Sequence, residues 1–188
     1  MPHIPPCLPA TASQETLAIY EEFYRGMGFS AAPNFILTQG HSSNVARGSW
    51  EAVRNVLVEG ELPRWIKELM FVAISVDRHC TYCAAAHVAC CRMLNVNPEW
   101  TDAVEHSNLE LISDPKLKAM IEFAVRCARR PQSLVSGDFN HLRSFTLRDS
   151  EIMEIIGMAA LAVYANIIAD ATAMQGDEMF SQLEKVTQ

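Results

Sequence analysis

Apolar residues recur every three or four positions along most of the chain, which is the spacing of helices that bury one face. Ser13 is a good N-cap for such a pattern, so we predict a helix over residues 13–27. A second helix is predicted over residues 42–58, with Gly60 at its C-terminal end. Strictly alternating apolar and polar runs, which indicate strands, do not occur in the sequence. The pattern therefore predicts an all-α fold.

The same period and the same capping rules predict the rest of the chain. Residues 62–76 are apolar around most of the helix circumference, so we expect this helix at the centre. Thr146 and Asp149 are expected to form a capping box for the last helix. The remaining predicted segments are 80–94, 98–106, 115–129 and 147–174, with a short helix or loop over 134–142.

Proline usage sets the predicted domain organisation. Four of the nine prolines lie in residues 1–12, which we expect to form an extended arm. Residues 13–188 are predicted to be one helical domain, with residues 60–95 as its core motif. Hydrophobic residues make up 49% of the chain and aromatic residues 8%. A chain of this size cannot bury so much apolar surface alone, so we expect subunit contacts in a homo-oligomer.

Charge and apolar runs exclude several classes of partner. Lys and Arg total 15 against 22 Asp and Glu, a net charge of −7, and no basic stripe is present. Nucleic acid is therefore not an expected partner. The longest uncharged apolar run, residues 155–169, is shorter than the roughly 20 residues that span a bilayer, so no membrane partner is expected. Six cysteines without a secretory signal favour a reducing, cytoplasmic location.

The candidate chemistry lies at the predicted break between residues 76 and 80. Cys80, Cys83 and His87 follow one another at intervals of three and four, which places them on one face of a helix. A helix N-terminus favours a thiolate, and a neighbouring imidazole can accept the thiol proton. Glu68 on the preceding helix is positioned to orient that imidazole. The sequence thus predicts a redox-active dithiol with a proton relay.

Other interpretations of these residues remain open at this point. The two cysteines are alternatively a chance pair, and Glu68 alternatively pairs with Arg64 or Lys67 at the helix surface. Structural zinc requires Cys90 or Cys91 in addition to Cys80, Cys83 and His87. A helix rises about 16 Å from Cys80 to Cys91, which is too far for one ion, so no metal is expected. We expect three of the other cysteines to be core thiols, namely Cys90, Cys91 and Cys127. Cys7 in the arm is expected to be exposed and unpaired.

The motif resembles that of the alkylhydroperoxidase D-like group of the carboxymuconolactone decarboxylase superfamily. The similar elements are Glu68, an apolar helix, Ser75, Cys80-Thr-Tyr-Cys83 and His87. The likeness extends over about residues 35–175. It implies a single-domain helical bundle of this type that forms homotrimers or homohexamers and needs no cofactor. The best-characterised peroxidases of the group carry His where this chain has Tyr82.

The resemblance also implies an activity and a role for each residue. Cys83 attacks a small peroxide as a thiolate and becomes a sulfenic acid, and Cys80 then condenses with it to a disulfide. His87 and Glu68 form the proton relay, with Ser75 and Tyr82 in support. An external dithiol or a lipoylated protein restores the dithiol. The alternatives are a redox sensor or interaction module that does not turn over and, less favoured, a structural zinc site.

Overall fold

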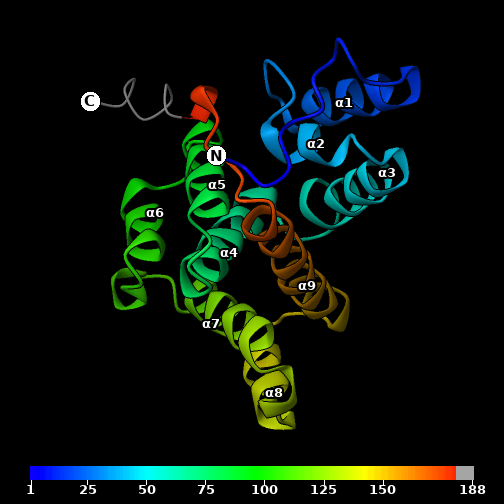
Figure 1. The fold of residues 1–188 in the computed structure, drawn as a ribbon. Helices are drawn as coiled ribbons and strands as arrows, with labels where there is room; N and C mark the ends of the chain where they lie inside the picture. The colour runs from blue at the N-terminus through cyan, green and yellow to red at the C-terminus, as the bar shows by residue number, and fades with distance from the viewer. Residues whose placement is uncertain (181–188) are drawn as a thin grey trace.

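The computed structural model describes residues 1–180, and within these residues every regular element is helical (Figure 1). The all-α prediction is confirmed. The helices are α1 (Gln14–Met27), α2 (Asn34–Gln39), α3 (Ser43–Ala52), α4 (Arg64–Asp77), α5 (Thr81–Met93), α6 (Pro98–Glu105), α7 (Pro115–Arg129), α8 (Ser136–Ser144) and α9 (Asp149–Ala171). A π-helical segment, η1 (Val53–Val58), continues α3, and two short 3₁₀ turns are η2 (Leu109–Leu111) and η3 (Pro131–Ser133).

Helix α4 lies at the centre of the molecule, as its sequence predicts. It packs against α5, α6, α7 and α9, while α1, α2 and α3 form a separate group on one side (Figure 1). Every residue from Ile66 to Ser75 is buried, including the charged Lys67 and Glu68. A helix that is apolar on nearly all sides needs neighbours on all sides, and α4 has them.

Two predicted boundaries are wrong. The predicted helix 42–58 is α-helical only as far as Ala52, and residues 53–58 widen into a π-helical turn. Thr146 does not cap α9, because its φ of 64° places it in the left-handed region. The cap is Arg148, whose backbone N–H donates to the Glu151 carboxylate at 2.8 Å. Helix α2 follows Pro33 and has no side-chain cap, so its sequence carries no start signal.

The N-terminal arm lies against the helices. Its backbone N–H groups at His3 and Cys7 donate to the carbonyls of Thr172 and Leu37, at 2.8 and 3.0 Å. Tyr20 donates its hydroxyl to the Cys7 carbonyl at 2.9 Å. These bonds hold Cys7 in a buried position, so the expectation of an exposed Cys7 is wrong. The predicted C-terminal limit of the domain, residue 188, lies outside the described residues.

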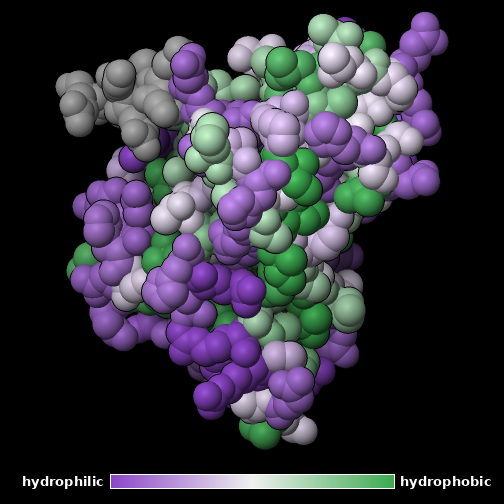
Figure 2. Space-filling model, in the orientation of Figure 1, coloured by the Kyte–Doolittle hydropathy of each residue, from purple (hydrophilic) through white to green (hydrophobic). Residues whose placement is uncertain are grey.

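Helix α9 is apolar on its outer side as well as its inner side. By length and composition it is the one helix in residues 1–180 that could cross a membrane, but half of it is buried in the core. Met153, Tyr164 and Ile167 are exposed on it. Figure 2 shows apolar groups gathered along the band where Figure 1 draws α9. The outer side of α9 therefore carries exposed apolar side chains.

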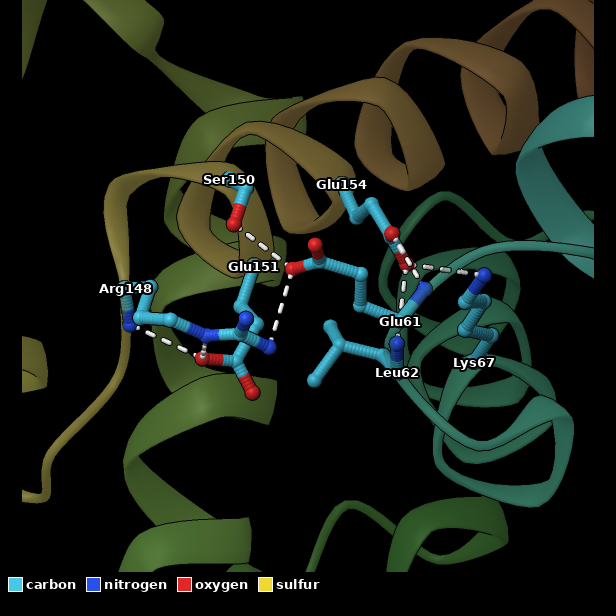
Figure 3. Close-up of polar contacts among 7 residues, drawn as sticks. All are labelled: Glu61, Leu62, Lys67, Arg148, Ser150, Glu151 and Glu154. Carbon is cyan, nitrogen blue, oxygen red and sulfur yellow. Dashed lines mark hydrogen bonds and ion pairs between the residues drawn. The ribbon is translucent and has the colours of Figure 1, made fainter.

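An ion pair between a buried lysine and a partly exposed glutamate joins α4 to α9 (Figure 3). Lys67 has no exposed surface, and its Nζ lies 2.9 Å from Oε2 of Glu154 and also donates to the Glu59 carbonyl. The Glu154 carboxylate accepts the backbone N–H groups of Glu61 and Leu62, at 2.6 and 3.1 Å. Lys67 therefore joins α9 and the loop before α4, and the interpretation that pairs it with Glu68 is wrong.

Candidate active site

The chain turns sharply between α4 and α5, which brings the two cysteines next to the end of α4. His79 has a φ of 60°, and the Cys80 N–H donates to the Ser75 carbonyl at 2.9 Å. Cys80 is the N-cap residue of α5, and Cys83 lies in the first turn of that helix. The predicted polar break is thus present, and it places both thiols at a helix N-terminus.

Glu68 and His87 meet across the α4–α5 interface. His87 Nδ1 lies 2.5 Å from Oε2 of Glu68, and Arg64 donates through Nε to Oε1 of the same carboxylate at 2.9 Å. Glu68 is fully buried. Phe71 stacks on the imidazole with ring centroids 3.5 Å apart and an interplanar angle of 14°. The histidine ring is therefore fixed by a carboxylate at its edge and an aromatic ring on its face.

The charges around Glu68 determine its ionisation. Burial by itself raises the pKa of this carboxyl. The charge and hydrogen bond of His87, together with those of Arg64, outweigh burial, and the pKa is lowered from its ordinary value. Glu68 is therefore ionised at neutral pH. Because Nδ1 of His87 donates to that carboxylate, Nε2 is the ring nitrogen that remains to accept a proton.

A cavity of about 50 Å³ lies beside this relay. Cys83, His87 and Cys90 line it from α5, whereas Cys80 is fully buried behind Cys83. The rest of its lining is apolar and rich in aromatic rings: Phe23, Met27, Phe29, Pro33, Phe35, Val53, Leu57, Phe71, Tyr82, Ala86, Leu161, Ala165 and Phe180. Of the two cysteines in the motif, only Cys83 meets a molecule that enters this space.

The expectation of a lowered thiol pKa is wrong for Cys83. A hydrogen bond with Cys80 and burial raise the pKa of the Cys83 thiol well above its ordinary value, and a hydrogen bond from Asn166 opposes them in part. The helix N-terminus does not compensate, since the cavity wall is apolar and the side chain is almost fully enclosed. Cys83 is therefore a thiol at neutral pH and needs a base to become a nucleophile.

The two supporting residues hold the site in place from either side. Ser75 accepts a hydrogen bond from Asn166 Nδ2 at 3.0 Å, which ties α4 to α9 next to Cys80. Tyr82 donates its hydroxyl to Asp177 at 2.7 Å and accepts the Phe35 N–H at 3.0 Å. Burial and the Asp177 carboxylate raise the pKa of Tyr82 well above its ordinary value. Tyr82 is thus a fixed anchor.

The structure adds three residues to the predicted site. Arg64 binds Glu68 within the protein, although its spacing of four suggested only a surface pair. Cys90 lines the cavity, although its apolar context indicated a core thiol. Asn166 reaches Ser75 and Cys83 from a helix that begins far along the chain. The spacing of four between Arg64 and Glu68 and of three between His87 and Cys90 were the signals available in the sequence.

The proposed zinc ligands do not come together as a set. Within residues 1–180, the group of donor atoms that lie within 4.8 Å of one another belongs to Glu68, His87 and Cys90. Arg64 is already paired with Glu68 and also forms a hydrogen bond with Cys90, so a positive charge lies beside these donors. A divalent cation would meet that charge at close range, which disfavours a metal site here.

The fold is the all-α fold of AhpD-like proteins. Residues 46–109, which include Glu68, both motif cysteines and His87, match the model of the carboxymuconolactone decarboxylase family. The predicted resemblance is confirmed. A curated relative, an alkyl hydroperoxide reductase of Mycobacterium tuberculosis, is 28% identical over 85 residues, which are 45% of this chain and 24% of that protein. The match thus spans about a quarter of that relative's length.

Solved structures share the fold over nearly the whole chain. An alkylhydroperoxidase AhpD core, an uncharacterized peroxidase-related protein from Ralstonia eutropha, has a TM-score of 0.86 and 24% identity, covering 95% of this chain and 94% of that one. A peroxidase-related protein from Silicibacter has a TM-score of 0.83 and 23% identity, covering 95% and 96%. A debrominase in complex with 2,3,4-tribromopyrrole has a TM-score of 0.78 and 18% identity, covering 98% and 97%.

Proposed function

We propose that this protein is a thiol-dependent peroxide reductase in which Cys83 is the attacking thiol and Cys80 the resolving thiol. One observation carries the proposal: Cys83 and His87 line the same small cavity, and His87 is oriented by an ionised, buried Glu68. A thiol with a raised pKa beside an oriented imidazole has a base to remove its proton.

The reaction follows from the positions of these groups. His87 takes the proton of Cys83, and the thiolate attacks the outer oxygen of a hydroperoxide. The O–O bond breaks, the alkoxide takes the proton back from His87 and leaves as an alcohol, and Cys83 becomes a sulfenic acid. The Cys80 thiol then displaces water from this sulfur and forms a disulfide. An external dithiol, in our proposal a small dithiol or a lipoylated protein, reduces the disulfide and is itself oxidised.

The size of the cavity favours peroxide over a halogenated ring. A cavity of about 150 Å³ is known to hold benzene, so one of about 50 Å³ is too small for an aromatic molecule. The brominated pyrrole bound by the debrominase therefore does not fit the cavity as it stands. Hydrogen peroxide has two non-hydrogen atoms against six in benzene and is the size of molecule that a cavity of about 50 Å³ admits.

We further propose that the protein acts in the cytoplasm as a homotrimer or homohexamer. Six free cysteines suit a reducing compartment. The exposed apolar side chains of α9, Met153, Tyr164 and Ile167, supply a surface that assembly would cover. Light scattering of the purified protein tests this, and a monomer at micromolar concentration would contradict it.

The decisive experiment for the function is peroxide-dependent oxidation of dihydrolipoamide, followed over many turnovers. We expect Cys83→Ser to abolish turnover and Cys80→Ser to stop it after one round, with Cys83 left as a sulfenic acid that dimedone traps. Cys127→Ser is the matched control, because Cys127 is half-buried on α7 and does not line the cavity. Equal turnover in all three variants would overturn the proposal.

The same experiment distinguishes an enzyme from a redox sensor. A sensor forms the Cys80–Cys83 disulfide once and changes its assembly, but consumes no further peroxide with any dithiol present. Turnover beyond one peroxide per chain therefore supports the enzyme, and a single stoichiometric oxidation supports the sensor.

A further inference from the structure

We infer that residues 174–180 form a size-selecting wall of the cavity, with Phe180 as a specificity-determining residue and Tyr82 and Asp177 as the positioning pair that holds it. The inference rests on the proposed function for its substrate, since it assigns compact hydroperoxides to the site and excludes those with an aromatic group. It also makes a prediction about access to Cys83 that is independent of peroxide turnover.

Phe180 forms one wall of the cavity by packing against α5 and against Phe29. It is 6% exposed, and it packs on Ala86 and Ala89 of α5. Its ring meets that of Phe29 edge-on, with centroids 5.4 Å apart and an interplanar angle of 72°. Phe29 and Phe180 both line the cavity, together with Cys83. The volume available beside the thiol therefore depends on where the Phe180 ring lies.

Three residues upstream of Phe180, Asp177 fastens the segment to the rest of the protein. Its Oδ2 accepts the Tyr82 hydroxyl at 2.7 Å, and its Oδ1 accepts the Asn34 N–H at 2.8 Å. The Asn34 side chain in turn donates to the Gln175 carbonyl at 3.1 Å. In Figure 1 this C-terminal segment, drawn in red, lies at the end of α5. These polar contacts therefore hold the segment in addition to the packing of Phe180 on α5.

The position of Tyr82 links the wall to the reactive thiols. Tyr82 stands between Cys80 and Cys83 in the chain, and its ring lines the cavity while its hydroxyl reaches Asp177. A hydroxyl buried in apolar surroundings is costly without partners, and here it has two, Asp177 and the Phe35 N–H. The hydrogen bond between Tyr82 and Asp177 therefore fixes the position of the wall relative to the turn of α5 that carries Cys83. In this inference Tyr82 positions the wall and takes no part in proton transfer.

The first test measures selectivity between two peroxides. For each variant we compare kcat/KM for cumene hydroperoxide with kcat/KM for hydrogen peroxide. The wild-type protein should prefer the compact hydrogen peroxide, and Phe180→Ala should raise the ratio of kcat/KM for cumene hydroperoxide to that for hydrogen peroxide about tenfold, the equivalent of about 1.4 kcal/mol. Phe139→Ala is the matched control, because Phe139 packs edge-on against Phe123 at 5.3 Å and 79° and does not line this cavity. An unchanged ratio in Phe180→Ala would overturn the inference.

The second test examines access to Cys83 without any peroxide. Site-resolved mass spectrometry gives the alkylation rates of Cys83 and Cys127 with iodoacetamide and with a bulky aromatic maleimide. Phe180→Ala should raise the maleimide to iodoacetamide rate ratio at Cys83 and leave that at Cys127 unchanged. If the protein shows no peroxidase turnover but this ratio rises, the proposed function fails and the wall stands. If turnover is present and neither ratio moves, the wall fails alone.

The positioning pair is tested with Tyr82→Phe and Asp177→Asn. Each should raise the maleimide ratio at Cys83 in the wild-type background but add nothing in the Phe180→Ala background, because both act through the Phe180 ring. A merely structural role predicts additive losses in melting temperature and no change of this ratio. Additive effects on the ratio would contradict the inference.

Discussion

Lys67 and Glu68 are neighbours in α4, both fully buried and of opposite charge, yet they serve two different regions of the molecule. Successive helix residues point about 100° apart, so Lys67 reaches α9 and Glu68 reaches α5. Lys67 meets the Glu154 carboxylate and the Glu59 carbonyl. Glu68 meets Arg64 and His87. Two buried charges on one helix thus fasten it to two different partners.

The difference lies in what stands behind each ion pair. The Lys67–Glu154 pair is completed by backbone N–H groups of the loop before α4, so nothing remains for it to bind. The Glu68–His87 pair ends in an imidazole that lines a cavity together with a thiol. The first arrangement has a structural role, because loss of either partner would leave a charge without its counter-charge. The second can pass a proton to a molecule in the cavity, which is what the proposed reaction needs.

The largest effect that this comparison predicts is on stability, at the closed pair. Glu154→Ala leaves the Lys67 ammonium buried without its carboxylate, and we expect the free energy of unfolding to fall by about 3 kcal/mol. Urea unfolding at pH 7 measures it. The control is Glu51→Ala, which removes a half-exposed partner of Arg54 and should cost far less. Equal losses in the two variants would show that the Lys67–Glu154 pair contributes no more to stability than a surface pair.

At the open pair we expect the larger effect on activity. Glu68→Gln keeps the size of the side chain but removes the charge that orients and supports His87, so kcat/KM for peroxide should fall about 100-fold, or about 2.7 kcal/mol. Glu154→Gln is the matched control, since it changes the other carboxylate facing α4. Its kcat/KM per folded molecule should stay near the wild-type value. A similar loss of activity in both variants would remove the distinction between the two pairs.

Much of the site was predictable from the sequence because it is local. The spacing of Cys80, Cys83 and His87 places them on one helix face. A Glu in an apolar helix indicates that α4 contributes a functional residue as well as core packing. The partner of Lys67 was not predictable, since Glu154 lies on α9 and only the packing of α9 on α4 brings it near. A hydrogen bond with Cys80 and then burial raise the pKa of Cys83. The residues that enclose the thiol come from six helical segments and the C-terminal segment, and no spacing rule brings these together.

The pH dependence of stability separates the two roles further. The folded pKa of Glu68 is lowered, so its ion pair stabilises the fold above the unfolded value of about 4.3 and loses that contribution as the pH falls through the folded pKa. The difference in unfolding free energy between wild-type protein and Glu68→Gln should therefore shrink below about pH 4. Urea titrations at pH 7, 5, 4 and 3 measure it. A difference that grows on acidification would contradict the direction of the shift.

The smallest effect concerns a third contact of α4, which is buried but neutral. Ser75→Ala removes the acceptor of the Asn166 amide at 3.0 Å, and a lost buried hydrogen bond of this kind costs about 1 kcal/mol. Because Asn166 also donates to Cys83 and lowers its pKa, the freed amide should bind the Cys83 sulfur more fully. We therefore expect Ser75→Ala to lose a little stability and to shift the pH profile of Cys83 alkylation to lower pH. Ser49→Ala, at a buried serine away from the cysteines, should lose stability without that shift. A parallel shift in both variants would show that the profile follows loosening of the fold instead of the Asn166 contact.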